Sequence, residues 1–268
     1  MRQLVRSAVV ALASICAPLA LGALIAPAAQ AVEEHALLQA SFSPDRLGAP
    51  TTISFSFHVS TAEGAAPPPM TALDLQLPAG MNYTTTTLGL ATCDATTLTT
   101  RGLAGCPANS RLGHGSALVE VPFGVGGGHE IPEIQAVAGP SPKGNLVVLF
   151  YANGLYPVYA QLAFSGEVLP DSGRFGSQLS ATIPLVTSVP GGPDVSVVSV
   201  QTTIGPNQLT YYRRVHGRQQ PFKPRGVAVP ERCPSGGFPF SAQFSFLDGT
   251  TTSATATVAC PPPRRHAR

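Results

Sequence analysis

The chain has 268 residues, of which 44% are hydrophobic and only 11% are charged, with 16 Lys and Arg against 14 Asp and Glu. The hydrophobic fraction supplies enough material for a core and argues against an intrinsically disordered protein. The near balance of charge gives no support to a nucleic-acid-binding function. Gly and Pro number 27 each, which is typical of strands joined by turns rather than of helices.

Residues 1–31 have the pattern of a secretory signal peptide. Arg2 and Arg6 precede an almost unbroken apolar run from Ala8 to Ala26, and Ala29-Gln30-Ala31 has the small-x-small pattern of a cleavage site. The alternative is an uncleaved membrane anchor, because a run of about 19 residues is nearly long enough to span a bilayer. Removing the segment leaves 14 basic and 14 acidic residues. We expect a secreted or cell-surface protein that has no membrane span once the signal peptide is cleaved.

The remaining chain alternates between apolar and polar residues with a period of two. Residues 53–60 carry Ile, Phe, Phe and Val at odd positions and Ser or His at even positions, and residues 73–77 repeat the pattern with three leucines. Residues 146–151 are apolar at both parities, which favours a central strand, and residues 195–200 are a further candidate strand. This pattern predicts an antiparallel sheet that covers a core.

Eight or more short strands predict one or two β-sandwiches. The Gly-rich stretch at 124–128 suggests a break between a first domain at 32–124 and a second at 129–260, followed by a disordered basic tail at 261–268. A long hairpin loop within one domain fits the same glycines, so the number of domains stays open.

The C-terminal strands allow their register to be predicted. The phenylalanines of residues 238–246 share one parity, as do the alanines of the return strand at 254–260. A two-residue turn at 248–249 would put these alanines on the wrong face, whereas a three-residue loop, Asp248–Thr250, opposes Phe244 to Ala254. We therefore predict the three-residue loop.

The mature chain keeps four cysteines, Cys93, Cys106, Cys233 and Cys260, because Cys16 lies in the signal peptide. Four cysteines in an exported protein allow three disulfide connectivities. We favour the two short loops, Cys93–Cys106 and Cys233–Cys260, and the predicted hairpin register brings the second pair together. No pair has the spacing of a zinc site or of a redox-active motif, so we expect no metal and no cofactor.

The first cysteine pair lies in a recognisable pattern. Leu77-Pro78-Ala79-Gly80 precedes Cys93, and Cys106-Pro107-Ala108-Asn109-Ser110 leads into a predicted strand. The pattern resembles that of a group of exported bacterial proteins of unknown function, and the resemblance continues through residues 210–217 and 233–249. It implies an extracellular immunoglobulin-like β fold with local disulfides. It implies no activity, ligand or catalytic residue.

Enzyme signatures are sparse. The chain lacks a Gly-x-Ser-x-Gly elbow, although His114, between Gly113 and Gly115, has Ser110 and Ser116 nearby as conceivable partners in a nucleophile–base pair. The simpler interpretation is a solvent-facing turn histidine. We predict a non-enzymatic structural or binding protein, with a secreted hydrolase that uses a dispersed Ser/His site as the alternative.

The strongest binding candidate is a basic segment rich in tyrosine. Residues 32–204 carry 5 basic and 12 acidic side chains, whereas residues 205–268 carry 9 basic and 2 acidic ones. Arginine binds phosphate or uronate groups bidentately, and tyrosine stacks on sugars, which favours an anionic cell-envelope polymer as partner, or else another surface protein. An edge strand protected by charge and pairing with the acidic part of the chain are the structural alternatives. The candidate residues are Tyr211, Tyr212, Arg213, Arg214, His216, Arg218, Lys223 and Arg225.

Overall fold

The structure is a computed structural model that describes residues 34–83, 91–122, 127–205, 209–223 and 226–262. The predicted signal peptide and most of the predicted basic tail lie outside the described residues. The strands are β1 (Glu34–Ser43), β2 (Pro50–Thr61), β3 (Met70–Pro78), β4 (Arg111–Val121), β5 (Gly128–Glu130), β6 (Glu133–Ala138), β7 (Leu146–Gly154), β8 (Ala160–Pro170), β9 (Phe175–Thr182), β10 (Ser196–Ile204), β11 (Tyr211–Val215), β12 (Arg218–Phe222), β13 (Val227–Ala228), β14 (Phe238–Phe246) and β15 (Thr251–Val258). The described helices are α1 (Ala95–Arg101) and two short 3-10 turns, η1 (Gly102–Gly105) and η2 (Ala108–Ser110).

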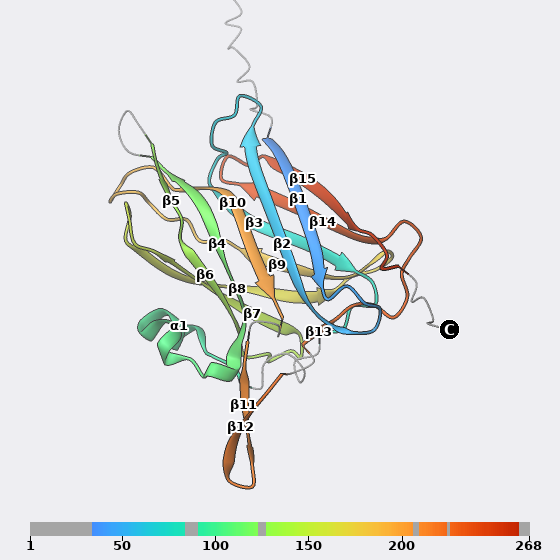
Figure 1. The fold of residues 1–268 in the computed structure, drawn as a ribbon. Coiled ribbons are helices and arrows are strands. Elements are labelled where there is room, and N and C mark those ends of the chain that lie inside the picture. Colours follow the sequence, from blue (N-terminus) through green and yellow to red (C-terminus); the bar gives the residue numbers. More distant parts are fainter. Residues whose placement is uncertain (1–33, 84–90, 123–126, 206–208, 224–225, 263–268) are drawn as a thin grey trace, which may run out of the picture. The chain divides into compact units, whose positions relative to one another are not determined.

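Thirteen of these strands form one antiparallel sheet that curls until its ends meet (Figure 1). The strand order is β1-β2-β10-β4-β6-β7-β8-β9-β3-β14-β15, with β13 added to β2 and β5 added to β4. The two ends are joined through side chains, because the Thr252 hydroxyl donates to the Glu34 carbonyl at 2.9 Å and the Thr250 hydroxyl donates to the Glu34 carboxylate at 3.1 Å. The sheet is therefore a nearly closed barrel.

The all-β, antiparallel character of the fold is confirmed, but strand order corrects the expected division at 124–129. Strand β10 lies between β2 and β4, and β3 lies between β9 and β14, so the strands of residues 32–124 and 129–260 are interleaved in one sheet. One barrel-like sheet stands where we expected one or two sandwiches. The physical reason is that strand pairing over long sequence distances depends on the whole sheet, whereas glycine content reports only local flexibility.

The barrel core follows the predicted alternation. The apolar residues of β2, from Ile53 to Val59, are buried at odd positions, while the Ser and His residues between them are half-buried or exposed. Strand β14 contributes the centre of the core, where Phe238, Phe240 and Phe244 have at most 1% of their surface exposed. The rings of Phe57 and Phe244 lie 4.9 Å apart. The predicted core faces of these strands are confirmed.

Strand β7 is buried on both faces, as its continuous apolar sequence predicted. Val148 and Phe150 point into the barrel, whereas Leu149 and Tyr151 pack on the outside against Leu98 of α1 and Cys93. Asp94 caps the start of helix α1, because its side chain accepts from the Thr97 backbone N–H at 2.7 Å. We call residues 93–110, which hold α1, η1 and η2, the disulfide lobe.

Both predicted disulfides are present. Cys93 and Cys106 join the two ends of the region around α1, with their Cα atoms 5.2 Å apart. Cys233 and Cys260 lie at 5.8 Å and link the segment before β14 to the end of β15. The first bridge therefore closes the region that packs on the outside of β7, and the second joins the two ends of the C-terminal hairpin.

The C-terminal hairpin has the predicted faces but a corrected register. Phe244 pairs with Thr252 rather than with Ala254, and Ala242 pairs with Ala254, so the three-residue loop is Leu247–Gly249 instead of Asp248–Thr250. A shift of two residues leaves every side chain on its own face. Gly249 has φ of +86°, and the last residue of such a loop is left-handed, which places the glycine at the end of the loop.

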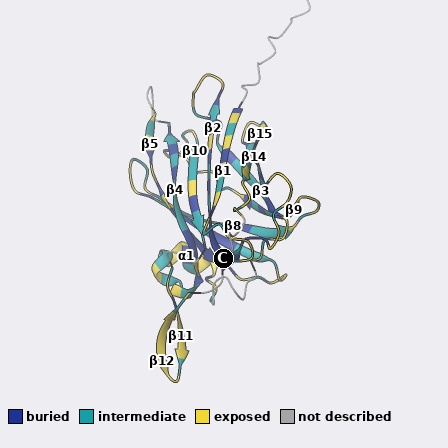
Figure 2. Ribbon diagram, turned by 45° about the vertical axis from the view of Figure 1, so that its right-hand side comes forward, coloured by how far each residue is buried: buried dark blue, intermediate teal, exposed yellow. Residues whose placement is uncertain are grey.

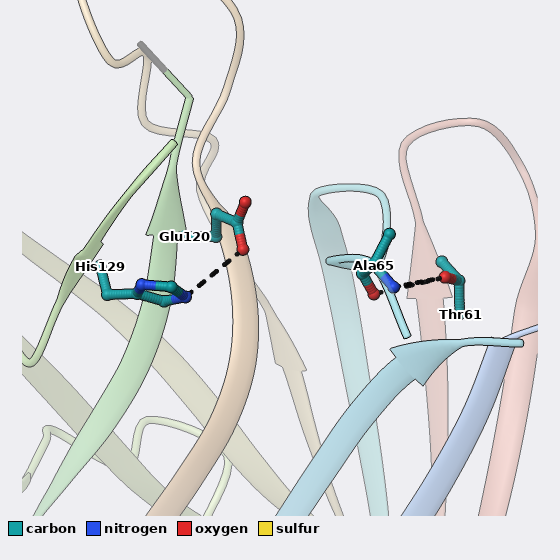
Figure 3. A network of polar contacts seen from close by, with 4 residues as sticks. All are labelled: Thr61, Ala65, Glu120 and His129. Atoms are coloured by element: carbon teal, nitrogen blue, oxygen red, sulfur yellow. Dashed lines mark hydrogen bonds and ion pairs between the residues drawn. The ribbon is translucent and has the colours of Figure 1, made fainter. Parts of the chain in front are cut away.

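Side-chain contacts also brace the barrel end at which β2 and β4 finish (Figure 3). His129 Nε2 of β5 lies 3.6 Å from a carboxylate oxygen of Glu120 in β4. At the end of β2 the Thr61 hydroxyl accepts from the Ala65 backbone N–H at 3.0 Å. These contacts hold the loops at the end that also carries the β7–β8 and β9–β10 connections.

Candidate functional site

The predicted basic segment forms a separate two-stranded sheet, β11–β12, which projects from the barrel end at which β4 begins (Figure 1). We call residues 211–222 the basic hairpin. His216 and Gly217 form its two-residue turn, with φ of +49° and +78°, between the paired residues Val215 and Arg218. Positive φ at both positions is the geometry of the tight hairpin turn that matches the twist of the strands. His216 therefore has a conformational role at the tip.

The base of the basic hairpin is attached to the disulfide lobe. The Asn109 side chain donates to the Tyr212 carbonyl at 2.7 Å and accepts from the Tyr212 backbone N–H at 2.9 Å. The Tyr211 hydroxyl donates to the Arg111 carbonyl, and its side chain is only 2% exposed. Burial raises the pKa of Tyr211 to about 12. Tyr211 therefore anchors the basic hairpin to the barrel, and its buried ring is not accessible for the sugar stacking that we expected.

Figure 2 shows that the strands of the basic hairpin are largely exposed. Its arginines occupy both faces, as the strand pairing places them. Directly paired residues share a face, and the pairs Arg213–Gln220 and Val215–Arg218 lie on the same one. On this face the Arg213 guanidinium lies 5.4 Å from the centre of the Phe222 ring. The opposite face carries Arg214 and Tyr212, and the latter is 46% exposed.

Charge pairing does not neutralise the three hairpin arginines. Residues 205–225 contain no Asp or Glu, and within the described part of the chain no ion pair links a carboxylate to Arg213, Arg214 or Arg218. The expected alternative of pairing with the acidic part of the chain is therefore not seen for these three. Lys223 is exposed just beyond β12, and Arg225 lies outside the described residues.

The glycines on either side of His114 allow two strands to approach each other closely. Gly113 and Gly115 face the neighbouring strand β10, where an added Cβ would collide with the carbonyl oxygens of Thr203 and Gln201. They permit the close approach of β4 to β10, and His114 lies half-buried in the regular strand β4. The expected turn histidine is thus a strand residue.

The conceivable nucleophiles do not engage His114. Ser110 is fully buried and donates to the Pro107 carbonyl at 2.7 Å. Ser116 lies two residues along β4 from His114, opposite Glu133 of β6. Across the described residues no hydrogen bond joins His114 to either serine or to Glu133, so the chain shows no assembled nucleophile–base pair at this point.

A second candidate site, which the sequence did not reveal, lies inside the barrel. A partly open cavity of about 150 Å³ is lined by apolar side chains from β2 to β4 and from β6 to β10, together with the loops at the end opposite the basic hairpin. A smaller cavity of about 50 Å³ lies towards the barrel end that carries the basic hairpin, and Phe55 and Leu179 line both cavities. The period-two pattern identified the inward side chains, but the space between them depends on how the sheet closes.

Comparison with models of protein families, with curated proteins and with solved structures finds no match to this chain. Within the described ranges, no group of His, Cys, Asp and Glu is suited to hold a metal ion. In the same residues, no helix has the length and apolar character needed to cross a membrane. The candidate sites therefore rest on the geometry of the chain itself.

Proposed function

We propose that this protein is an exported, non-enzymatic binding protein that contacts anionic polymers of the cell envelope through the basic hairpin. The observation that carries the proposal is the set of three arginines on both faces of a projecting hairpin, with no carboxylate paired to them in the described residues. The two disulfides support an extracytoplasmic location, because such bonds persist in oxidising compartments.

The local geometry suits a linear polyanion. A guanidinium presents two parallel N–H donors to a phosphate or carboxylate, which a lysine ammonium does not. Stacking on Phe222 restrains Arg213, so less side-chain entropy is lost when a ligand binds. The exposed ring of Tyr212, beside Arg214, provides an apolar surface for a sugar.

The two hydrogen bonds from Asn109 make the hairpin a fixed extension of the disulfide lobe rather than a free loop. A polymer that binds along β11 and β12 therefore meets charges at set positions. This arrangement predicts binding that weakens with salt, since exposed charge pairs are screened over about 8 Å at physiological ionic strength.

The test is retention of the mature chain, residues 32–268, on beads that carry polyphosphate, polygalacturonate or uncharged dextran, with the salt raised stepwise. We expect retention on both polyanions and none on dextran. Arg213→Ala with Arg214→Ala should abolish retention at physiological salt, whereas replacing both arginines by lysine should weaken it.

The matched control is Arg46→Ala with Arg174→Ala. Both control arginines are exposed on the barrel, and Arg174 lies 4.8 Å from the Phe175 ring centre, much as Arg213 stacks on Phe222. Equal losses in the two double variants would make retention a property of total charge and contradict the proposal. Absence of binding at every salt concentration would also contradict it and leave a protein partner as the default.

A further inference from the structure

The barrel cavity offers a ligand almost no polar group. Of its lining residues, only Thr202 and Glu130 carry polar side chains. The hydroxyl oxygen of Thr202 is covered by protein atoms and has no hydrogen-bond partner in the described residues. The Glu130 carboxylate accepts from the backbone N–H groups of Tyr156 and Val158 at 3.1 and 3.4 Å. Since a polar group buried without a partner costs free energy, the lining favours a hydrocarbon over a polar ligand.

An exposed apolar rim surrounds the cavity mouth. Leu155, Tyr156 and Tyr159, from the β7–β8 loop, have 66%, 83% and 70% of their surfaces exposed. Ile131, next to the lining residue Pro132, is 70% exposed, and Leu185 both lines the cavity and is 42% exposed. Most of the large exposed apolar side chains in the described chain thus gather at one end of the barrel, and such a patch marks a binding surface.

We propose that the cavity binds the hydrocarbon chain of a single-chain lipid, methyl end first, with the polar headgroup left at the mouth beside Tyr156 and Tyr159. A closed apolar cavity of about 150 Å³ stays dry and accepts a molecule the size of benzene, so this one accommodates one chain end and excludes two side by side. Tyrosines suit the mouth because they combine an apolar ring with a hydroxyl.

The rim extends the apolar surface beyond the cavity itself. The part of the chain that does not fit inside lies against Leu155, Tyr156 and Leu185 rather than in water. Affinity therefore rises with chain length beyond what the cavity alone holds. Two further methylenes should strengthen binding about tenfold, since each methylene that leaves water stabilises the complex. Headgroup charge should matter little, because the headgroup stays in water at the mouth, where interactions between charges are screened.

The test uses the neutral fluorophore N-phenylnaphthylamine, which the mature chain should bind in one saturable site. Displacement is measured with butanoate, octanoate, decanoate and dodecanoate, and with lauroyl lysophosphatidylcholine, all below the concentrations at which they form micelles. We expect affinity to rise along the series. Dodecanoate and the lysolipid, which share a chain and differ in headgroup, should bind within about threefold of each other.

Ala152→Phe places a ring inside the cavity, and Asn153→Phe places the same ring on the outer face at the next position of β7. Ala152→Phe should weaken lipid binding by about tenfold or more, and Asn153→Phe should leave it unchanged. If Ala152→Phe does not fold, Ala160→Phe at the mouth replaces it.

Three results would overturn the proposal. They are a lack of saturable probe binding, affinities that follow the headgroup instead of the chain, and unchanged binding in the folded cavity variant. Sedimentation with phosphatidylcholine vesicles that is equal for the parent and Ala152→Phe proteins would also overturn it, and would make the rim a contact with a bilayer surface.

Discussion

Removing the Cys93–Cys106 disulfide should open the disulfide lobe while the barrel stays folded. The bridge closes a separation of 13 residues, for which chain entropy gives a stabilisation of about 3 kcal/mol. Without it, the lobe is held to β7 mainly by a small apolar cluster around Leu98, Leu149 and Tyr151. That cluster is separate from the barrel core, so its contacts can be lost alone.

The lost stabilisation should appear as faster proteolysis of the disulfide lobe. A loss of about 3 kcal/mol in the free energy of lobe opening raises the open population on the order of 100-fold. Arg101, in the last turn of α1, is exposed, and tryptic cleavage after it reports this opening. In the Cys93→Ser, Cys106→Ser variant we expect that cleavage to accelerate by this factor under native conditions. Cleavage within the basic hairpin should rise as well, because Asn109 anchors it.

The matched control is Cys233→Ser with Cys260→Ser. This bridge spans 27 residues, so its loss costs a similar free energy, about 3.5 kcal/mol. It lies beside β14, whose phenylalanines form the centre of the barrel core, and its removal should lower the urea midpoint of the whole barrel. Equal acceleration of cleavage at Arg101 in both variants would refute the separate opening of the lobe.

Three further predictions concern the core, the hairpin turn and the buried tyrosines. Phe244→Ala, which empties a fully buried site against Phe57, should lower the unfolding free energy in urea by about 3–5 kcal/mol; a loss below about 1 kcal/mol would place this ring outside the core. Gly217→Val puts a β-branched residue at φ of +78° and should speed tryptic cleavage in the hairpin while leaving the barrel's thermal midpoint unchanged; a shifted midpoint would contradict the independence of the two. Burial raises the pKa values of Tyr83 and Tyr211 to about 12, so the folded state keeps protons that the unfolded state loses near pH 10, and stability should fall as pH rises from 10 towards 12. Tyrosinate absorbance should show Tyr83 and Tyr211 ionising last, and Tyr211→Phe should remove one of these two late transitions. Ionisation of every tyrosine near pH 10 in the folded protein would contradict the raised pKa values.

The sequence by itself determined the features that depend on neighbouring residues. A period of two assigned the inward faces of β2 and β14, since successive side chains of a strand point to opposite sides. The short separations of the cysteines favoured the two local bridges, both of which formed. The run of Tyr and Arg from 211 to 218 indicated a distinct basic segment, whereas its hairpin form, with positive φ at His216 and Gly217, comes from the structure.

Tertiary structure alone decided what depends on residues far apart in the chain. The interleaving of β10 and β3 replaced the expected domain boundary, and the meeting of β1 with β15 made a barrel. Tyr211 and Tyr212 look equivalent in the sequence. In the structure the Tyr211 hydroxyl donates to the Arg111 carbonyl and its ring is buried, whereas the ring of Tyr212 is exposed. The cavity likewise exists only because many inward side chains fail to fill the closed sheet. A local pattern specifies which way a side chain points, whereas the space it meets is set by the strands that come to lie opposite.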